Sequence, residues 1–431
     1  MTRSRYLIIG NSAAGVAAVE AIRQADGKGA ITVVSDEDVV NYSRPLISYY
    51  LGGRVSEDRM AFRDRRFYER NEVALILGRK AEELDVERRR VVLSDGTELG
   101  YEKLLIATGG RPIIPPMDGL RKVREGAFTF TRLSDAKEML KYIRENEVKE
   151  AVVLGAGLIG LKATEGLVER GIKVTIVELA DRILANTLDR EASAILERAL
   201  GNWGCKVIKE DTISRVISSR GRVREVVLRS GRSLSAPLLV IAVGVRPNLE
   251  LVEDTPINYD RGITVDEHMR TNVEDVYAAG DVAQARDFLT GWSSVIAIWP
   301  VAFRQGKVAG WNMAGRETRY EGLFPMNSVE LAGIPTISFG TTNPPEADGY
   351  EILARKDEES CLYRKIVLKE NKVVGAIFLG RIERAGIFSG LIKDGIDVSS
   401  FKEELLSDDF GLLVLPAEYR KHMVKGEGME V

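Results

Sequence analysis

The pattern of apolar and polar positions near the start of the chain recurs later along it. Residues 5–35 contain a short apolar run, "RYLIIG", then a stretch with apolar positions at helical spacing, "SAAGVAAVEAIRQA", and a second apolar run, "AITVVS". Short apolar runs are typical of buried strands, so the segment predicts a strand, a glycine turn, a helix and a strand, which is a βαβ unit. Residues 150–178 repeat this order. The sequence therefore predicts two nucleotide-binding units of one plan, whose turns begin at Gly10 and Gly155.

A second pair of segments is also duplicated. One segment, "SDGTELGYEKLLIATGGRP", ends at Pro112, and its counterpart, "SGRSLSAPLLVIAVGVRPN", ends at Asn248. Each predicts a turn and an apolar strand that ends in a glycine bend, at Gly109 and at Gly244. The second βαβ unit lies between the two segments, so the second nucleotide-binding domain is predicted to be inserted in the first.

The last part of the chain differs from the two repeats. A helix is predicted from near Pro300, because the first turn of a helix tolerates proline. From about residue 320 the sequence changes to short strands and turns, including the hairpin "YRKIVLKENKVVGAIFLG". The predicted fold class is α/β, with two Rossmann-like domains and a C-terminal α+β interface or dimerisation domain. The first, second and third domains are expected at residues 1–115 with 245–320, 116–244, and 321–431.

Composition and charge narrow the classes of function. The 61 lysines and arginines nearly balance the 64 aspartates and glutamates, and the formal charge of -3 gives no electrostatic reason to expect nucleic acid or an anionic membrane as a partner. No segment approaches the roughly 20 apolar residues of a transmembrane helix. With 45% hydrophobic residues the chain is typical of a globular protein, and its 431 residues suffice for two or three domains.

Cysteine and histidine are scarce. Cys205 and Cys361 are too few and too far apart in sequence for a disulfide framework, a CxxC pair or a thiolate metal site. His268 and His422 supply neither a histidine-built metal centre nor a Ser/His/Asp triad, and His422 is expected to be a solvated or capping residue. No metal site is predicted, and the cysteine usage indicates a reducing compartment, the cytoplasm.

The second turn meets the full dinucleotide-binding pattern, GxGxxG. It follows a predicted strand and opens a predicted helix, and Glu178 ends the next strand 21 residues after Gly157. The glycines allow a tight turn and close approach of a pyrophosphate, which the helix N-terminus attracts. Glu178 can accept hydrogen bonds from a ribose 2'-hydroxyl and would repel a 2'-phosphate, which favours NAD(H), while Arg182 leaves NADP(H) open. The predicted NAD(H) site comprises Gly155, Gly157, Leu158, Ile159, Gly160, Glu178 and Gly244.

The first turn, "GNSAAG", places Ser12 where the pattern has its middle glycine. Serine is small, and its hydroxyl could donate a hydrogen bond to a phosphate oxygen, so the turn is compatible with a working site. Two carboxylates, Asp36 and Glu37, follow the next predicted strand and are placed to meet an adenosine ribose. Of the two, Glu37 is favoured, and Asp36 is expected in a solvated loop.

Taken together, the motifs resemble one family. In order along the chain they are the GxxxxG turn at Gly10, "LLIATGGRP", the GxGxxG turn at Gly155, "VIAVGVRPN" and "TNVEDVYAAGD". This set resembles the FAD-dependent pyridine nucleotide-disulfide oxidoreductase superfamily over about residues 5–390. Within that superfamily, "NYSRPLISYYLGG" followed by the third domain is similar to the branch of rubredoxin reductases, ferredoxin reductases and nitrite reductase flavoproteins.

The resemblance implies FAD in the first domain, NAD(H) in the second, and roles for particular residues. The first turn would hold the FAD pyrophosphate, Glu37 the adenosine ribose, and the backbone of Ala81 the adenine. Arg44 and Pro45 would line the flavin, and the helix near Pro300 would point its positive end at the flavin N1 and C2 carbonyl. The implied FAD site comprises Gly10, Ser12, Ala13, Ala14, Gly15, Glu37, Arg44, Pro45, Ala81, Thr108, Gly109, Asp281 and Trp299.

Several features depart from relatives or leave two interpretations. The region that carries the redox-active cysteines of disulfide reductases reads "VVNYSRPLISYYLGG", which has no cysteine, so thiol-disulfide chemistry at the flavin is excluded.

Lys162 stands where many relatives have a glutamate near the nicotinamide; it could steady reduced flavin or orient the carboxamide, or it could pair with Glu165 on its own helix. Tyr49 stands where ferredoxin reductases often have lysine, which counts against close kinship with oxygenase-coupled ferredoxin reductases. Trp299 either packs against the flavin or is an ordinary core tryptophan.

The resemblance implies an FAD oxidoreductase in which hydride passes from NADH to flavin N5. Without a thiol relay, the electrons would pass directly to a docked acceptor, which would be rubredoxin, ferredoxin, or a partner subunit with an iron-sulfur or other metal centre. Two alternatives stay open: an NADH oxidase that reduces oxygen, and an NADH-sensing flavoprotein with a role in assembly. The chain is expected to form a homodimer or to be a subunit of a hetero-oligomeric complex.

Overall fold

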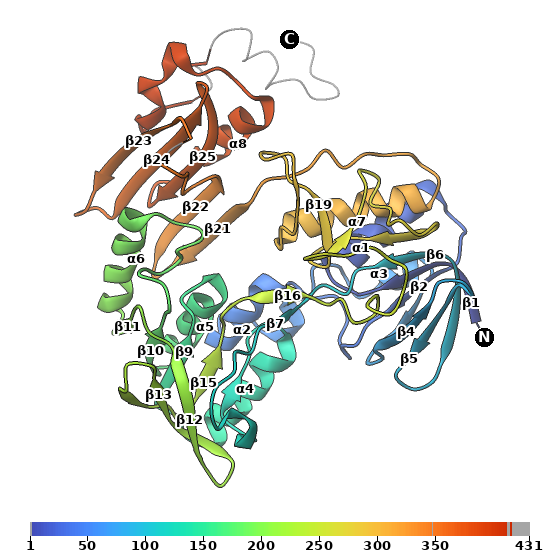
Figure 1. Ribbon diagram of the computed structural model, residues 1–431, viewed down its shortest axis with the longest axis horizontal. Helices are drawn as coiled ribbons and strands as arrows, with labels where there is room; N and C mark the ends of the chain where they lie inside the picture. The colour runs from blue at the N-terminus through green and yellow to red at the C-terminus, as the bar shows by residue number, and fades with distance from the viewer. Residues whose placement is uncertain (1, 347, 412–413, 416–431) are drawn as a thin grey trace.

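The computed structural model describes residues 2–346, 348–411 and 414–415, and in it the chain forms three regions (Figure 1). Two regions are built on largely parallel sheets with helices, and the third on an antiparallel sheet. The predicted α/β fold with a separate C-terminal region is therefore confirmed. Within the described residues, no helix has the length and apolarity that a membrane crossing requires. His422 lies outside them.

The first sheet has the strand order β3-β2-β1-β6-β5-β4, with β18 paired to β6. Strands β3, β2, β1, β6 and β18 run parallel, whereas β4 and β5 form an antiparallel extension. The central strands are continuous apolar runs because both faces of the sheet are covered, and Leu7 and Leu105 have no exposed surface. The strand bounds are β1 Thr2–Ile9, β2 Ile31–Val34, β3 Val73–Ile76, β4 Ala81–Asp85, β5 Arg90–Leu93, β6 Glu98–Ile106 and β18 Val276–Ala278.

Two helices of the first region pack closely because small residues meet along their contact. In helix α1 (Ala13–Ala25) and helix α7 (Trp299–Met313), a Cβ atom at Gly306 would collide with the Ala14 backbone, and one at Gly310 with the Ala18 backbone. Residues 14 and 306 therefore lie side by side, as do 18 and 310, so the helices run in the same direction. Helix α7 begins at Trp299, one residue before the predicted start. Both N-termini point to the same end of the region.

The second sheet is entirely parallel, with the order β11-β10-β9-β15-β8. Its sequence of β9, turn, α5 and β10 repeats that of β1, turn, α1 and β2, so the predicted duplication is confirmed. A small antiparallel sheet, β12-β13-β14, extends from this region (Figure 1). The bounds are β8 Ala127–Phe128, α4 Leu133–Glu145, β9 Glu150–Leu154, α5 Leu158–Val168, β10 Lys173–Val177, α6 Arg190–Asn202, β11 Lys206–Ile208, β12 Ile213–Ser219, β13 Arg222–Leu228, β14 Ser233–Ser235 and β15 Leu239–Ile241.

A two-stranded ribbon joins the first two regions. Strand β7 (Gly110–Pro112) leads into the second region, and strand β16 (Val245–Pro247) leads out of it beside β7 in antiparallel pairing. The side-chain amide of Asn248 donates to the Thr108 carbonyl at 2.8 Å, and the Thr108 hydroxyl donates to the Asn248 carbonyl at 3.1 Å. The chain therefore leaves and rejoins the first region at one place, as expected for an inserted unit (Figure 1).

A segment of the first region packs into the core of the second. Helix α2 (Ile47–Gly52) contacts α4 and α5, and Leu51, which has no exposed surface, lies in the same hydrophobic cluster as Leu133 and Leu161. Helix α3 (Phe67–Arg70) then leads back to β3. A small sheet of β17 (Ile263–Thr264), β19 (Ala283–Arg286) and β20 (Ser293–Ser294) precedes α7.

The third region is a five-stranded antiparallel sheet in the order β21-β22-β25-β24-β23, packed on helix α8 (Ala385–Asp394). The predicted hairpin is confirmed as β24 and β25. Its core contains aromatic rings in contact: the Phe388 ring lies 5.0 Å from that of Phe378 and 5.1 Å from that of Phe410. The strand bounds are β21 Met326–Leu331, β22 Ile334–Gly340, β23 Tyr350–Asp357, β24 Leu362–Lys369 and β25 Lys372–Leu379.

Candidate functional site

A large cavity opens at the carboxyl ends of the parallel strands of the first sheet, which is where α/β folds bind ligands. Its volume is about 820 Å³, which is within the range of small-molecule sites. Every predicted FAD residue except Gly15 lines it: Gly10, Ser12, Ala13, Ala14, Glu37, Arg44, Pro45, Ala81, Thr108, Gly109, Asp281 and Trp299. The structure therefore brings together residues that are spread over most of the first region.

The same cavity reaches the second glycine turn. Leu158, Ile159 and Lys162, at the start of α5, form part of its wall. The other predicted NAD(H) residues, Gly155, Gly157, Gly160, Glu178 and Gly244, do not line it. One cavity is thus shared by the two nucleotide-binding units, and the second turn itself lies beyond it.

The sterics of the first turn explain two of its glycines and its serine. Gly10 has φ of +120°, and a Cβ there would collide with the Ala107 carbonyl oxygen. A Cβ at Gly15 would collide with the Gly10 carbonyl oxygen, so this glycine permits close packing of α1. Ser12 has extended backbone, with φ of -109°, which any residue adopts. The matching Gly157 has no atom within 4 Å of an added Cβ, so a side chain at this position is sterically acceptable.

Polar groups that face the cavity fit a phosphate-containing ligand. Ser12 is the N-cap of α1, no side chain caps the helix, and its first turn has no acidic residue. The N–H groups of this helix end are therefore available to an anion. Asn11 Nδ2 and Ser48 Oγ, both in cavity-lining residues, are buried without a hydrogen-bond partner among the described residues. A bound polar group would satisfy these atoms.

Asp281 lies just after β18 and lines the cavity. Burial raises the pKa of its carboxyl group, and the positive charge of Arg44 opposes that shift. A partly buried carboxylate at a cavity wall needs hydrogen-bond donors, and hydroxyl groups of a ligand would supply them. The position of Asp281 therefore fits its predicted role toward ribityl or pyrophosphate groups.

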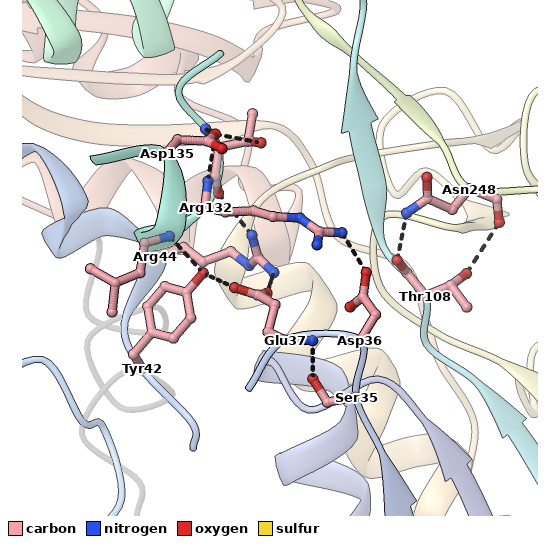
Figure 2. Close-up of polar contacts among 11 residues, drawn as sticks. Ser35, Asp36, Glu37, Tyr42, Arg44, Thr108, Arg132, Asp135 and Asn248 are labelled. Atoms are coloured by element: carbon pink, nitrogen blue, oxygen red, sulfur yellow. Dashed lines mark hydrogen bonds and ion pairs between the residues drawn. The ribbon is translucent and has the colours of Figure 1, made fainter. Parts of the chain in front are cut away.

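Glu37 is held by two side chains (Figure 2). Its Oε1 accepts from Arg44 Nη2 at 2.5 Å, and its Oε2 accepts from Tyr42 Oη at 2.7 Å. The carboxylate side chain is only 12% exposed. Because a carboxylate has about four lone-pair sites, these two bonds leave Glu37 able to accept from a ribose.

Asp36 is exposed, as expected for a residue of a solvated loop, and it also pairs with an arginine. Its Oδ2 accepts from Arg132 Nη2 at 2.7 Å, while its side chain stays 41% exposed. Arg132 also lines the cavity, and the sequence analysis missed it. The Asp135 carboxylate accepts from the Arg132 backbone N–H at 3.1 Å and so fixes the start of α4. The one signal in the sequence for Arg132 is its position just before a predicted helix, with Asp135 in the first turn.

Of the two interpretations of Lys162, the structure shows the pairing with Glu165. Its Nζ pairs with Glu165 Oε2, as proposed for the same helix face, and lies 4.7 Å from the centre of the Tyr49 ring. Glu165 Oε1 accepts from the Ala332 backbone N–H of the third region at 2.9 Å. Since Lys162 also lines the cavity, the pair joins all three regions at the cavity wall.

Glu178 ends β10 and is bonded to the backbone of its own unit. Its Oε2 accepts from the Ala156 N–H at 2.6 Å, and its Oε1 accepts from the Ala180 N–H at 2.8 Å. Arg182, which left the choice between NAD(H) and NADP(H) open, is paired with Asp181 at 2.9 Å. Through its bond from Ala156, the Glu178 carboxylate lies beside the second glycine turn.

Trp299 is the first residue of α7, and its ring packs against Phe62 in an edge-to-face pair with centroids 4.9 Å apart. The first turn of α7 contains no acidic residue and has no side-chain cap. Because a helix N-terminus carries a partial positive charge, this end of α7 favours negative charge in the cavity.

The two cysteines lie away from the cavity. Cys205 is buried in the core of the second region, where burial raises the pKa of its thiol to about 11. Cys361 is partly buried and packs against the same cluster, and neither cysteine lines the cavity. The cavity wall therefore has no thiol, in agreement with the sequence of residues 39–53.

Comparison with known proteins agrees with this architecture. Residues 4–306 match the family model for pyridine nucleotide-disulphide oxidoreductases, and residues 325–396 match that for the rubredoxin NAD+ reductase C-terminal domain. The chain is 35% identical over 408 residues to the epsilon subunit of NADH-dependent phenylglyoxylate dehydrogenase from Aromatoleum evansii, covering 94% of this chain and 95% of the relative. It is 28% identical to NADH-rubredoxin oxidoreductase from Clostridium acetobutylicum, covering 95% and 98%. A NAD-dependent persulfide reductase structure from A. fulgidus superposes with a TM-score of 0.84 and 28% identity, covering 92% of this chain and 78% of that one.

Two nucleotide-binding units that share one cavity are typical of an oxidoreductase with two nucleotide cofactors. The chain belongs to the pyridine nucleotide-disulphide oxidoreductase family. It is an FAD-containing, NAD(H)-dependent enzyme of that family, and its cavity lacks the cysteine pair of the disulfide reductases.

Proposed function

We propose that this protein passes electrons from NADH through FAD to a docked redox partner, either a small carrier such as rubredoxin or ferredoxin or a metal-containing subunit of a larger oxidoreductase. The observation that carries the proposal is the single cavity, which is shared by both nucleotide-binding units and has no thiol in its wall. FAD, when bound, supplies the group that accepts a hydride and releases electrons one at a time. With no thiol relay in the wall, an external acceptor has to receive those electrons.

We assign the cofactors by region. FAD binds the region of residues 1–115 and 245–320, with its pyrophosphate at the N-terminus of α1, its ribose at Glu37, and Arg132 as an additional cation in the wall. NAD(H) binds the region of residues 116–244, with Glu178 toward its ribose. The end of α7 and Lys162 add positive charge to the cavity, although Glu165 offsets that of Lys162.

The partner assignment is supported by the names of relatives. The relative from Aromatoleum evansii is a subunit of a dehydrogenase, and the one from Clostridium acetobutylicum acts on rubredoxin. Residues 321–431 would then serve as an interface, in a homodimer or with another subunit. The free cysteines fit a reducing compartment, and we place the protein in the cytoplasm.

The test is stopped-flow reduction of the flavin by NADH, followed by separate mixing with oxygen, rubredoxin and ferredoxin. We expect fast reduction by NADH, slow reoxidation by oxygen and fast reoxidation by at least one carrier. Fast reoxidation by oxygen alone would contradict the carrier function and favour an NADH oxidase. A long-lived charge-transfer absorbance with no acceptor turnover would favour a sensor.

A further inference from the structure

The two carboxylates after β2 are connected to consecutive residues just before α4. Asp36 pairs with Arg132, as described above. Arg44, which holds Glu37, also donates from Nη1 to the Thr131 carbonyl at 2.8 Å. These contacts link residues that are 87 and 96 positions apart in the sequence, and they cross from the first nucleotide-binding unit to the second (Figure 2).

Tyr42 makes the third connection, and it ends on the helix itself. Leu133 is the first residue of α4, and its backbone N–H donates to Tyr42 Oη at 3.1 Å, while that hydroxyl donates to Glu37. The first N–H groups of a helix have no partner within the helix, so this donor depends on Tyr42. Burial raises the pKa of Tyr42, so its hydroxyl stays protonated and can donate and accept at once.

The helix that receives these contacts is part of the second core. Leu133 is 2% exposed and packs in the cluster that contains Leu161 of α5, the helix that opens at the second glycine turn. A shift of the first turn of α4 would therefore be transmitted to α5 through packed side chains. Among the described residues, the Glu178 carboxylate makes no such connection, and its partners are backbone N–H groups of its own unit.

We propose that Tyr42 is a positioning residue that couples ribose binding at Glu37 to the placement of α4 and, through α4, of the second nucleotide-binding unit. This inference rests on the proposed function in one respect, namely that the ribose bound at Glu37 belongs to FAD. Occupation of the site fixes the Glu37 carboxylate, and the Tyr42 hydroxyl transmits this order to the Leu133 N–H. By linkage, the same contact strengthens FAD binding by the factor by which FAD strengthens the contact.

Hydrogen-deuterium exchange of the full chain, with and without FAD, tests the coupling. In the unmodified protein, FAD is expected to slow exchange in the peptide that covers residues 131–136. In Tyr42→Phe, FAD still binds through the remaining site, but its slowing effect on this peptide should be about fivefold smaller, the size of one hydrogen bond. The absorbance of the nicotinamide-flavin complex formed with NADH should weaken in parallel.

Tyr142→Phe is the matched control. The Tyr142 hydroxyl lies on α4 and donates to the Pro237 carbonyl at 3.1 Å, within the second unit. This variant should keep the full FAD-induced protection of residues 131–136. If Tyr42→Phe fails to fold, Asp36→Asn removes the exposed ion pair with Arg132 and should reduce the protection in the same direction by a smaller factor.

The outcomes separate the coupling from the function. Equal FAD-induced protection in Tyr42→Phe and in the unmodified protein would overturn the proposal for Tyr42. If the unmodified protein shows the protection but is not reduced by NADH, the coupling stands and the proposed function fails. Loss of protection in Tyr142→Phe as well would mean that α4 is merely loosened, which also overturns the specific role of Tyr42.

Discussion

The two glycine turns of this chain are built on one backbone plan but differ at the middle position of the glycine pattern. In both, the first glycine has positive φ, +120° at Gly10 and +103° at Gly155, and an added Cβ would collide with a carbonyl of the neighbouring strand. In both, the last glycine packs against the first glycine's carbonyl. The middle position has open space, and Ser12 occupies it in one copy while Gly157 occupies it in the other. The outer glycines are thus required by the fold, and the middle one only by the approach of a ligand.

The carboxylates that follow the two turns differ in their partners. Glu37 is bonded to Tyr42 and Arg44, which connect to the other nucleotide-binding unit. Within the part of the chain that the structure describes, the Glu178 side chain is bonded to two backbone N–H groups of its own unit, those of Ala156 and Ala180. The first site is thereby tied into the contact between units, which supports the proposal that it holds a resident cofactor and that the second site holds an exchangeable one.

The largest expected effect comes from Gly10→Val. Valine cannot adopt φ of +120° without strain, and its Cβ would meet the Ala107 carbonyl, so the purified variant should lack nearly all bound FAD, as measured by flavin absorbance. Gly155→Val places the same strain in the other copy and should retain FAD while losing reduction by NADH. Equal loss of FAD in both variants would show that the two turns are not independent.

Lys162→Met should lower the free energy of unfolding by about 2 kcal/mol, because one oxygen of the buried Glu165 carboxylate loses its cationic partner. The equivalent position after the first turn is Ala17, which is fully buried and needs no partner. Denaturant unfolding provides the measurement, and Lys137→Met, which breaks an exposed pair with Glu57, should cost less than about 1 kcal/mol. Unchanged stability with strongly weakened NADH binding would instead make Lys162 a cofactor ligand.

Glu178→Ala should weaken NADH binding by about 10- to 100-fold, which corresponds to the loss of hydrogen bonds to a charged acceptor. FAD content should stay the same, because Glu178 does not line the shared cavity. Titration of the flavin-loaded variant with NADH under anaerobic conditions measures the change. Full NADH affinity in this variant would remove Glu178 from the site.

The smallest effect is expected from the reciprocal exchange at the middle position. Ser12→Gly should change FAD affinity by less than about threefold, since both residues fit the extended backbone there. Gly157→Ser should leave the fold intact, because the position is open, so any fall in NADH affinity reports on the approach of the ligand itself. If Ser12→Gly loses FAD, the serine hydroxyl is a required ligand.

The sequence predicts the parts of this molecule that depend on local pattern. The two βαβ units, the outer glycines and the hairpin of β24 and β25 follow from apolar periodicity and from glycine geometry. The pairing of Lys162 with Glu165 was also predictable from local pattern, because the two residues are neighbours on one helix face.

The remaining contacts join residues that are distant in sequence. Arg132 and Asp36 are 96 positions apart, and Tyr42 and Leu133 are 91 apart, so no periodicity reports their meeting. The bond from Ala332 to Glu165 depends on how the third region sits beside the second. Tertiary packing alone decides these pairs, including the ion pair that the exposed Asp36 makes with Arg132.

The ribbon of β7 and β16 has a consequence for how such enzymes diversify. Because Pro112 and Val245 are paired, residues 113–244 begin and end at one point, and the first sheet stays complete without them: β18 pairs with β6, both outside that stretch. Residues 113–244 can therefore be exchanged as one unit for another nucleotide-binding unit. A graft with a different nucleotide preference would require matched changes at the ribbon, at the segment around Tyr42 and Leu51 that packs into it, and at its contacts with the third region, such as the bond from Ala332 to Glu165.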